Sequence, residues 1–142
     1  MPRLQFQPAA RYPFVTELQI YASHINEGGH LDNVQLLSLV AEARGRFFAS
    51  LGYSVLDVAG HVFFVGDQAV QYKSEGFHGQ TLRIEMAPAD FNPKGFDLVY
   101  RVSEAQSGRE VALGKIGLVC VDPGSRKPSA IPETFWRQLQ AL

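Results

Sequence analysis

One long segment without proline, residues 34–51, most constrains what this chain can fold into. Only Gly45 interrupts its run of larger side chains, and Gly52 follows where a helix would stop. On a helical wheel of about 100° per residue, its apolar side chains fall in one stripe of roughly 140°. The stripe contains Leu36, Leu37, Val40, Ala43, Phe47, Phe48 and Leu51. The segment is therefore predicted to be one helix that buries this stripe, with Asn33 as its N-cap.

The other side of the predicted helix carries small or polar residues: Ser38, Glu42, Gly45, Arg46 and Ala49. Small side chains there permit close approach by a neighbouring chain or a ligand. Glu42 and Arg46 are spaced for an i,i+4 ion pair, which is worth about 0.2–0.5 kcal/mol. Arg44 lies inside the apolar stripe. We expect it either to extend its guanidinium to solvent or to pair with a buried carboxylate, for which Asp67 is a candidate.

Most of the remaining chain has the patterns of β-strands. Residues 14–21 alternate apolar and polar side chains, as a half-buried strand does. Further strands are expected at 61–65, 68–73, 80–86, 96–102 and 110–121, and the last three are separated by turn-forming stretches typical of an antiparallel meander. A short helix is expected at 134–142. The fold class predicted for residues 1–142 is a single α+β domain, an antiparallel β-sheet wrapped around a long central helix.

The charge balance excludes several classes of partner. The chain has 13 Lys+Arg against 14 Asp+Glu, without clusters, so neither nucleic acid nor a membrane surface is an expected partner. No stretch approaches the roughly 18 apolar residues of a membrane span, and the first thirty residues have no long apolar run behind basic residues, so neither membrane insertion nor secretion is expected. The lone Cys120 fits a reducing compartment, so we expect a cytoplasmic protein in which this thiol is an unreactive part of the core.

The predicted sheet has two edges, and one helix cannot cover both of its faces. An uncovered edge strand pairs readily with another chain, and pairing with a second copy is the simplest completion. A near-neutral surface also favours self-association. A homodimer or a homotetramer is therefore expected.

The loop before the helix has the most unusual composition in the chain. Residues 23–33 gather two His, two Asn, a Glu and an Asp around Gly28-Gly29. At this position the first turn of the helix offers unsatisfied N–H groups, and its dipole favours negative charge. An acyl carbonyl placed there would have its developing oxyanion stabilised. No metal or cofactor is expected, since His24 and His30 lack zinc-ligand spacing and no Gly-rich phosphate loop is present.

Three features of the first third of the chain resemble the 4-hydroxybenzoyl-CoA thioesterase family of hotdog-fold acyl-CoA thioesterases. They are the strand at 14–21, the loop Asn26-Glu-Gly-Gly-His-Leu-Asp-Asn33, and the helical Glu42-Ala-Arg44 followed by Phe47-Phe48 and Leu51-Gly52. The resemblance is most specific over residues 14–52, while the later strands match in order and length. It implies a hotdog fold, dimers or dimers of dimers, and hydrolysis of an acyl-CoA substrate at the dimer interface.

The loop departs from the family pattern, Asp-x-Asp-x-x-Gly-His-Val-Asn-Asn, at its acidic positions. Asn26 stands where the second Asp acts as nucleophile or base in one branch of the family, and His24 replaces the first. An Asn cannot accept the proton, although it can orient a water or the thioester carbonyl. A second branch uses a helical Glu. Glu42 is therefore the leading candidate for the base, with Glu27, Asp32 and His30 as rivals.

Substrate binding is assigned to the same loop and to two positions on the following strand. Glu27, Gly28, Gly29 and Asn33 are expected to line the thioester, with backbone N–H groups between Gly29 and Val34 holding its carbonyl. Phe64 is expected to line an acyl tunnel. Lys73 is expected to bind CoA phosphate, with further candidates at Arg83, Lys94, Arg126 and Lys127. Structural alternatives remain open: His30 as a packed loop residue, Asp32 as favourable charge at the helix start, and Asn33 as a cap.

Two other functions fit parts of the pattern. His30-Leu-Asp32 reproduces the His-x-Asp of hotdog enoyl-CoA hydratases, but Ile25 and Glu27-Gly28 stand where that motif has Asp and Asn-Pro. A non-catalytic acyl-ligand-binding protein is the second alternative, because a fold alone does not establish a function. The leading prediction is an acyl-CoA thioesterase.

Overall fold

The computed structural model describes residues 3–142. Along the chain its elements are β1 (Phe14–Gln19), the short 3-10 helix η1 (Ala22–His24), α1 (Asn33–Ser50), β2 (Val62–Tyr72), β3 (Thr81–Asn92), β4 (Gly95–Glu104), β5 (Glu110–Val121) and α2 (Glu133–Gln140). Each helix and strand expected from the sequence is present, with boundaries shifted by a few residues. The predicted α+β class is confirmed.

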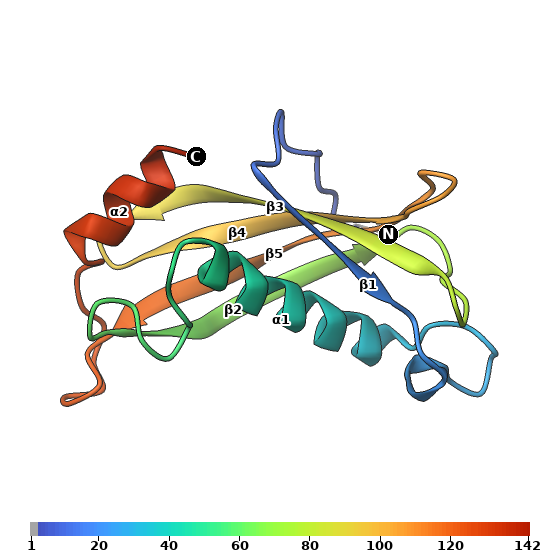
Figure 1. The fold of residues 1–142 in the computed structure, drawn as a ribbon, viewed down its shortest axis with the longest axis horizontal. Helices are drawn as coiled ribbons and strands as arrows, with labels where there is room; N and C mark the ends of the chain where they lie inside the picture. The colour runs from blue at the N-terminus through green and yellow to red at the C-terminus, as the bar shows by residue number, and fades with distance from the viewer. Residues whose placement is uncertain (1–2) are drawn as a thin grey trace.

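The strands form one antiparallel sheet in the order β1-β3-β4-β5-β2. The sheet curves around α1, which lies along one of its faces (Figure 1). The two segments expected at 61–65 and 68–73 join into the single strand β2, whose register shifts between Val65 and Asp67. Because β1 and β2 pair on one side only, they are the free edges of the sheet.

The buried face of α1 differs slightly from the predicted stripe. Leu36, Val40, Ala43, Phe47 and Phe48 are buried as expected, but Leu39 is buried too, whereas Leu37 and Leu51 are only half-buried. The face is rotated because β1 packs along one flank of α1, where Phe14 meets Phe47 edge-on with their ring centroids 5.6 Å apart.

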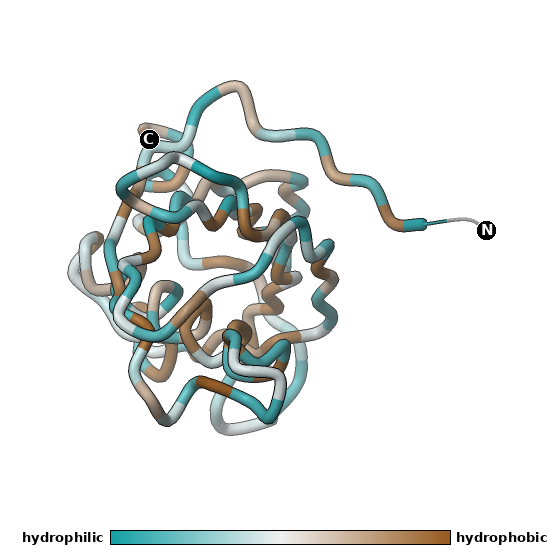
Figure 2. The backbone as a smooth tube through the Cα atoms, turned by 90° about the vertical axis from the view of Figure 1, so that its right-hand side faces the viewer, coloured by the Kyte–Doolittle hydropathy of each residue, from teal (hydrophilic) through white to brown (hydrophobic). Residues whose placement is uncertain are grey.

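Aromatic side chains fix the C-terminal end of α1. The Phe48 ring lies 5.5 Å from that of Phe63 on β2 and 5.5 Å from that of Phe135 on α2. Figure 2 shows the N-terminal segment leading away from the body of the molecule. Within residues 3–142 no helix is long and apolar enough to cross a membrane. At the opposite, N-terminal end of α1, the preceding loop packs beside the helix.

The N-terminus of α1 is capped one residue earlier than predicted. Asp32 is the N-cap: its Oδ2 accepts hydrogen bonds from the N–H groups of Val34 and Gln35 at 2.9 and 3.1 Å. Asn33 is the first helical residue, so its assignment as the cap is wrong. A carboxylate accepts these bonds and also favours the positive end of the helix dipole, which is why Asp32 takes the position.

Arg44 and Asp67 do not form the pair that the sequence left open. Lys115 Nζ lies 3.0 Å from Asp67 Oδ1 and 3.2 Å from Asp97 Oδ2. Arg44 is half-buried and, within residues 3–142, makes no ion pair. Burial accordingly lowers the pKa of its guanidinium. Of the two expectations for Arg44, pairing with Asp67 is wrong.

Candidate active site

A cavity of about 440 Å³ opens where α1 begins. Its walls come from the loop before α1, the first turn of that helix, and the residues at and after the end of β2. The lining includes five residues singled out from the sequence: Asn26, His30, Asp32, Asn33 and Lys73. The structure therefore brings predicted site residues from the loop and the start of α1 together with one predicted cation just after β2.

Asn26 lines the cavity, and the oxygen of its side-chain amide is already hydrogen-bonded. Its side-chain Oδ1 accepts a hydrogen bond from the Gly28 backbone N–H at 2.9 Å. The backbone N–H of Asn26 donates to the His30 carbonyl at 3.1 Å. With the oxygen engaged in this turn, the Nδ2 group is the part of the side chain left for a ligand. Asn26 can thus donate to a thioester carbonyl or to a water, but it cannot serve as a base.

His30 lies beside Asn26 with one ring nitrogen committed to the backbone. Its Nδ1 is 3.3 Å from the Leu31 carbonyl oxygen. A carbonyl only accepts, so Nδ1 carries the proton and Nε2 holds the lone pair in the neutral ring. That Nε2 is 4.0 Å from Glu75 Oε1. An imidazole that gains a proton at Nε2 would meet this carboxylate, so the arrangement supports a general base.

Gly28 allows the two side chains to meet. A Cβ at this position would stand 3.0 Å from His30 Nε2 and 3.2 Å from Asn26 Oδ1, closer than ordinary contacts. Gly29, with φ +80°, completes the turn in a conformation that favours glycine. Gly28, Gly29 and the exposed Glu27 stand next to the cavity and do not line it. The two glycines therefore shape the loop.

Few backbone N–H groups of the loop remain free for an oxyanion. Gly29 donates to the Asn26 carbonyl, Leu31 to that of Gly76, and Val34 to the cap Asp32. In the part of the chain that the structure describes, the N–H groups of His30 and Asn33 donate to no protein acceptor. The expected carbonyl-binding stretch between Gly29 and Val34 thus narrows to these two groups.

Tyr72 closes the cavity toward the edge strand β2. Its hydroxyl donates a hydrogen bond of 2.9 Å to the carbonyl of Asn33. Burial and, less strongly, the charge of Asp32 raise the pKa of this phenol, so it stays protonated. This bond fixes the start of α1 to the end of β2, next to Lys73, whose backbone N–H bonds to the Val111 carbonyl.

Sequence reasoning missed Tyr72 and Glu75. Both lie on or just after β2, about forty residues beyond the loop that they face. The polar run Lys73-Ser74-Glu75 followed by Gly76, directly after the predicted strand, was the signal within the sequence. Its link to the loop is a backbone hydrogen bond between Leu31 and Gly76, which no side-chain pattern encodes.

Glu42 is placed away from this cavity. It faces a separate groove between α1 and β1, where its Oε2 accepts from Arg46 Nε at 2.9 Å. Arg46 also donates to Thr16 Oγ1 at 2.9 Å and to the Glu17 carbonyl at 3.1 Å. The expected i,i+4 pair is present, and it holds Glu42 on the β1 flank of the helix.

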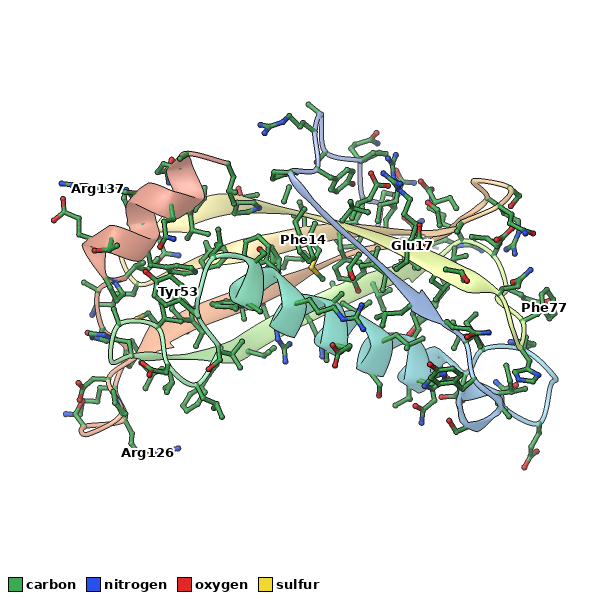
Figure 3. The ribbon with its side chains drawn as sticks, viewed as in Figure 1. Phe14, Glu17, Tyr53, Phe77, Arg126 and Arg137 are labelled. Carbon is green, nitrogen blue, oxygen red and sulfur yellow. The ribbon has the colours of Figure 1, made fainter. Side chains whose placement is uncertain are left out.

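Phe64, the predicted tunnel residue, and four of the five candidate cations do not line this cavity. Phe64 is 39% exposed, and the guanidinium of Arg126 lies 5.6 Å from its ring centroid. Figure 3 shows Arg126 at one end of the molecule and Phe77, which follows β2, at the other. Arg83 contacts Glu85 on β3. Of the five candidate cations, only Lys73 lines the cavity.

No group of three or more His, Cys, Asp or Glu side chains that could hold a metal ion occurs in residues 3–142.

The chain matches a family model. The model described as the thioesterase-like superfamily matches residues 21–139, which span the loop, α1 and the sheet strands β2 to β5. No curated protein matches the chain by sequence.

Solved structures share the fold at low sequence identity. A 1,4-dihydroxy-2-naphthoyl-CoA thioesterase from Synechocystis has 20% identity and a TM-score of 0.83, covering 91% of this chain and 96% of its own. A Staphylococcus aureus protein solved in complex with CoA has 17% identity and a TM-score of 0.83, covering 95% and 87%. A putative thioesterase from Pseudomonas aeruginosa has 18% identity and a TM-score of 0.81, covering 91% and 99%. The hotdog fold expected from the sequence resemblance is confirmed.

Proposed function

Because the chain belongs to the thioesterase-like superfamily, we propose that it hydrolyses acyl-CoA thioesters in the cavity at the start of α1. Family membership supports a thioester hydrolase as the class of enzyme. The observation that carries the site is the convergence of three kinds of group on one cavity: the Asn26 amide, the His30 imidazole and free backbone N–H groups.

The carbonyl oxygen of the thioester is bound by donors. Asn26 Nδ2 and the N–H groups of His30 and Asn33 are those left without a protein acceptor in the described residues. They lie in the loop before α1 and at its first residue, beside the cap Asp32. As the carbonyl becomes tetrahedral, charge develops on its oxygen and these bonds strengthen, which lowers the barrier.

His30 takes a proton from water. Its Nε2 accepts the proton as the water oxygen bonds to the carbonyl carbon, and Glu75 stabilises the imidazolium that results. When the tetrahedral intermediate collapses, the C–S bond breaks, and the sulfur leaves with the proton that imidazolium returns. The products are a carboxylic acid and the free CoA thiol. Glu42, paired with Arg46 on the other flank, remains the rival base.

Lys73 is the proposed binding group for a phosphate of CoA. It lines the cavity and forms no ion pair within residues 3–142. Its ammonium group is therefore free to bind an anion. The structural neighbour solved in complex with CoA supports this class of ligand.

A second copy of the chain would complete the site. The free edge strand β2 ends at Tyr72, which forms one wall of the cavity, and residues 64–68 of that strand are exposed. Antiparallel pairing of two β2 edges would satisfy the unpaired backbone groups and cover this wall. A homodimer, or a tetramer built from two such dimers, in the cytoplasm is part of the proposal; the location rests on the single Cys120.

A thiol-release assay over acyl-CoA substrates tests the proposal. We expect turnover that depends on His30. Saturable acyl-CoA binding without thiol release for any aliphatic or aromatic thioester would contradict it and favour the acyl-ligand-binding alternative. Loss of crotonyl-CoA absorbance without thiol release would instead identify an enoyl-CoA hydratase.

A further inference from the structure

The wall of the cavity that follows β2 is a short segment fixed at both ends. Residues 73–76 directly follow β2 and reach the loop before α1. The Lys73 N–H donates to a carbonyl of β5 at 2.8 Å, and the carbonyl of the buried Gly76 accepts from the Leu31 N–H at 2.8 Å. Between these ends lies Glu75, whose carboxylate is next to the proposed base. The position of this carboxylate therefore depends on what holds the middle of the segment.

Arg109 holds the middle of this segment from the neighbouring connection between β4 and β5. Its Nη1 donates to Ser74 Oγ at 2.6 Å and also to the backbone carbonyl of Glu75. The Ser74 hydroxyl donates in turn to the Glu110 carbonyl at 2.6 Å, so its oxygen is left to accept from the guanidinium. The β4–β5 turn and the segment after β2 lie at the same end of the molecule (Figure 1).

The turn that carries Arg109 is itself held in place. The buried carboxylate of Glu104 accepts hydrogen bonds from the N–H groups of Gln106 and Ser107 at 2.8 and 3.0 Å. The N–H of Glu104 donates to the Arg109 carbonyl at 2.8 Å. The bond from Gln106, those from Ser107 and the charge of Arg109 lower the pKa of Glu104, so it stays ionised and keeps these partners. Arg109 therefore extends from a fixed turn.

Neither ligand binding nor an ion pair accounts for the place of Arg109. Its side chain does not line the cavity, and within residues 3–142 it forms no ion pair. Its hydrogen bonds to the segment after β2 go to two neutral oxygens of adjacent residues. A planar guanidinium with several donors in a fixed arrangement suits such a task, and it loses little freedom for each bond that it forms.

We infer that Arg109 is a positioning residue for the hydrolysis: by holding Ser74 and Glu75 it keeps the Glu75 carboxylate beside the His30 imidazole. The inference rests on the proposed function, in which Glu75 stabilises the imidazolium formed at His30. Glu75 Oε1 lies 4.0 Å from His30 Nε2, and its side chain is 61% exposed, so little besides the backbone of the segment fixes it. At this separation a partly solvated carboxylate stabilises a cation by an amount worth roughly fivefold in rate.

A double-mutant cycle on kcat tests this inference. Arg109→Met removes both hydrogen bonds to the segment, and we expect kcat to fall by about fivefold, as it does when Glu75→Gln removes the charge itself. The chain that carries both changes should be within about twofold of Glu75→Gln alone, because residues that act through one another give losses that do not add. KM should change little, since Lys73 is held by its own bond to β5.

Two further variants separate positioning from a general loss of structure. Arg109→Lys keeps a cationic donor and should recover part of the lost kcat. Ser74→Ala removes one of the two oxygens that Arg109 holds, so it should lower kcat by less than Arg109→Met, and only when Glu75 is present. It also keeps the test open if Arg109→Met does not fold.

Arg101→Met is the matched control. Arg101 is likewise a half-buried arginine that joins two parts of the sheet, with its Nε 3.0 Å from Glu85 Oε1, and it makes no contact with residues 73–76. This variant should lose some thermal stability and keep the wild-type kcat. Tm values measured for all variants show that kinetics are compared on folded chains.

Three results would overturn the inference: an unchanged kcat in both Arg109→Met and Ser74→Ala, losses that multiply when Arg109→Met is combined with Glu75→Gln, or an equal loss in Arg101→Met. Each leaves the proposed thioesterase activity intact, because the wild type still releases thiol. A wild-type chain that releases thiol from no acyl-CoA would instead refute the proposed function, and the inference with it.

Discussion

The two flanks of α1 carry similar side chains and differ in how those side chains are used. The flank toward β1 holds His24, Glu42 and Arg46, and the flank toward β2 holds Asn26 and His30. On the β1 flank, Glu42 is bonded to Arg46, and His24 Nδ1 accepts the Tyr21 N–H at 2.9 Å. On the β2 flank, within residues 3–142, Asn26 Nδ2 has no protein acceptor. Polar groups can act on a ligand where the fold leaves them free, so we place the chemistry on the β2 flank.

The largest expected effect separates the two histidines. Replacing His30 by Ala removes the proposed base, and kcat should fall by about 10²–10⁴-fold. The matched variant His24→Ala alters the β1 flank and should retain most of the activity. Steady-state thiol release with one acyl-CoA measures both. Equal losses in the two variants would break the distinction between the flanks.

Asn26→Ala should produce the next largest loss. It removes a donor that strengthens as charge develops on the carbonyl oxygen, so kcat should fall by about 10²-fold with little change in KM. The variant also loses the acceptor of the Gly28 N–H, which should cost about 1 kcal/mol of stability. Kinetics at a temperature well below the measured Tm separate the two effects. A change confined to KM would show that Asn26 acts in binding alone.

Glu42→Gln should have a small effect on catalysis. The change weakens an exposed ion pair with Arg46, worth about 0.2–0.5 kcal/mol to stability, and touches nothing in the cavity. We expect less than a threefold change in kcat/KM. A loss as large as that of the His30 variant would move the base to the β1 flank and restore the interpretation that Glu42 acts as the helical Glu of the family's second branch.

The thiol of Cys120, which lies in the core, should not react with alkylating reagents while the chain is folded. Cys120 is fully buried, and burial raises the pKa of its thiol to about 11. The unfolded thiol ionises near pH ~8.5. Ionisation therefore favours the unfolded state, and the stability that the buried neutral thiol contributes falls as the pH rises from about 8.5 toward 11. Iodoacetamide should fail to label the folded chain at pH 8 and should label it in denaturant. Rapid labelling of the folded chain would show that the core opens there.

The fold could be predicted from the sequence because its signals are local. The proline-free segment 34–51 carries its own apolar stripe, and the alternating segments that follow it define strands whose turns allow only short connections. The flank of α1 toward which Glu42 points was not predictable. A helical wheel gives the angle of a side chain about the helix axis, whereas the position of β1 and β2 on either side depends on the order of strands in the sheet.

The candidate site was predicted only in part for a similar reason. Asn26, His30 and Asp32 are neighbours in the sequence and meet in one loop, whose composition indicated chemistry. Tyr72 ends β2 and Glu75 follows that strand, and their proximity to the loop is set by hydrogen bonds and strand register.

The most direct test of the account is a structure of the chain bound to a non-hydrolysable acyl-CoA analogue in which the thioester sulfur is replaced by a methylene group. We predict that its carbonyl oxygen lies within hydrogen-bond distance of Asn26 Nδ2, that His30 Nε2 faces its carbonyl carbon across one water, and that Lys73 contacts a phosphate. An analogue bound with its carbonyl next to Glu42, in the groove between α1 and β1, would contradict the assignment of the active site to the β2 flank.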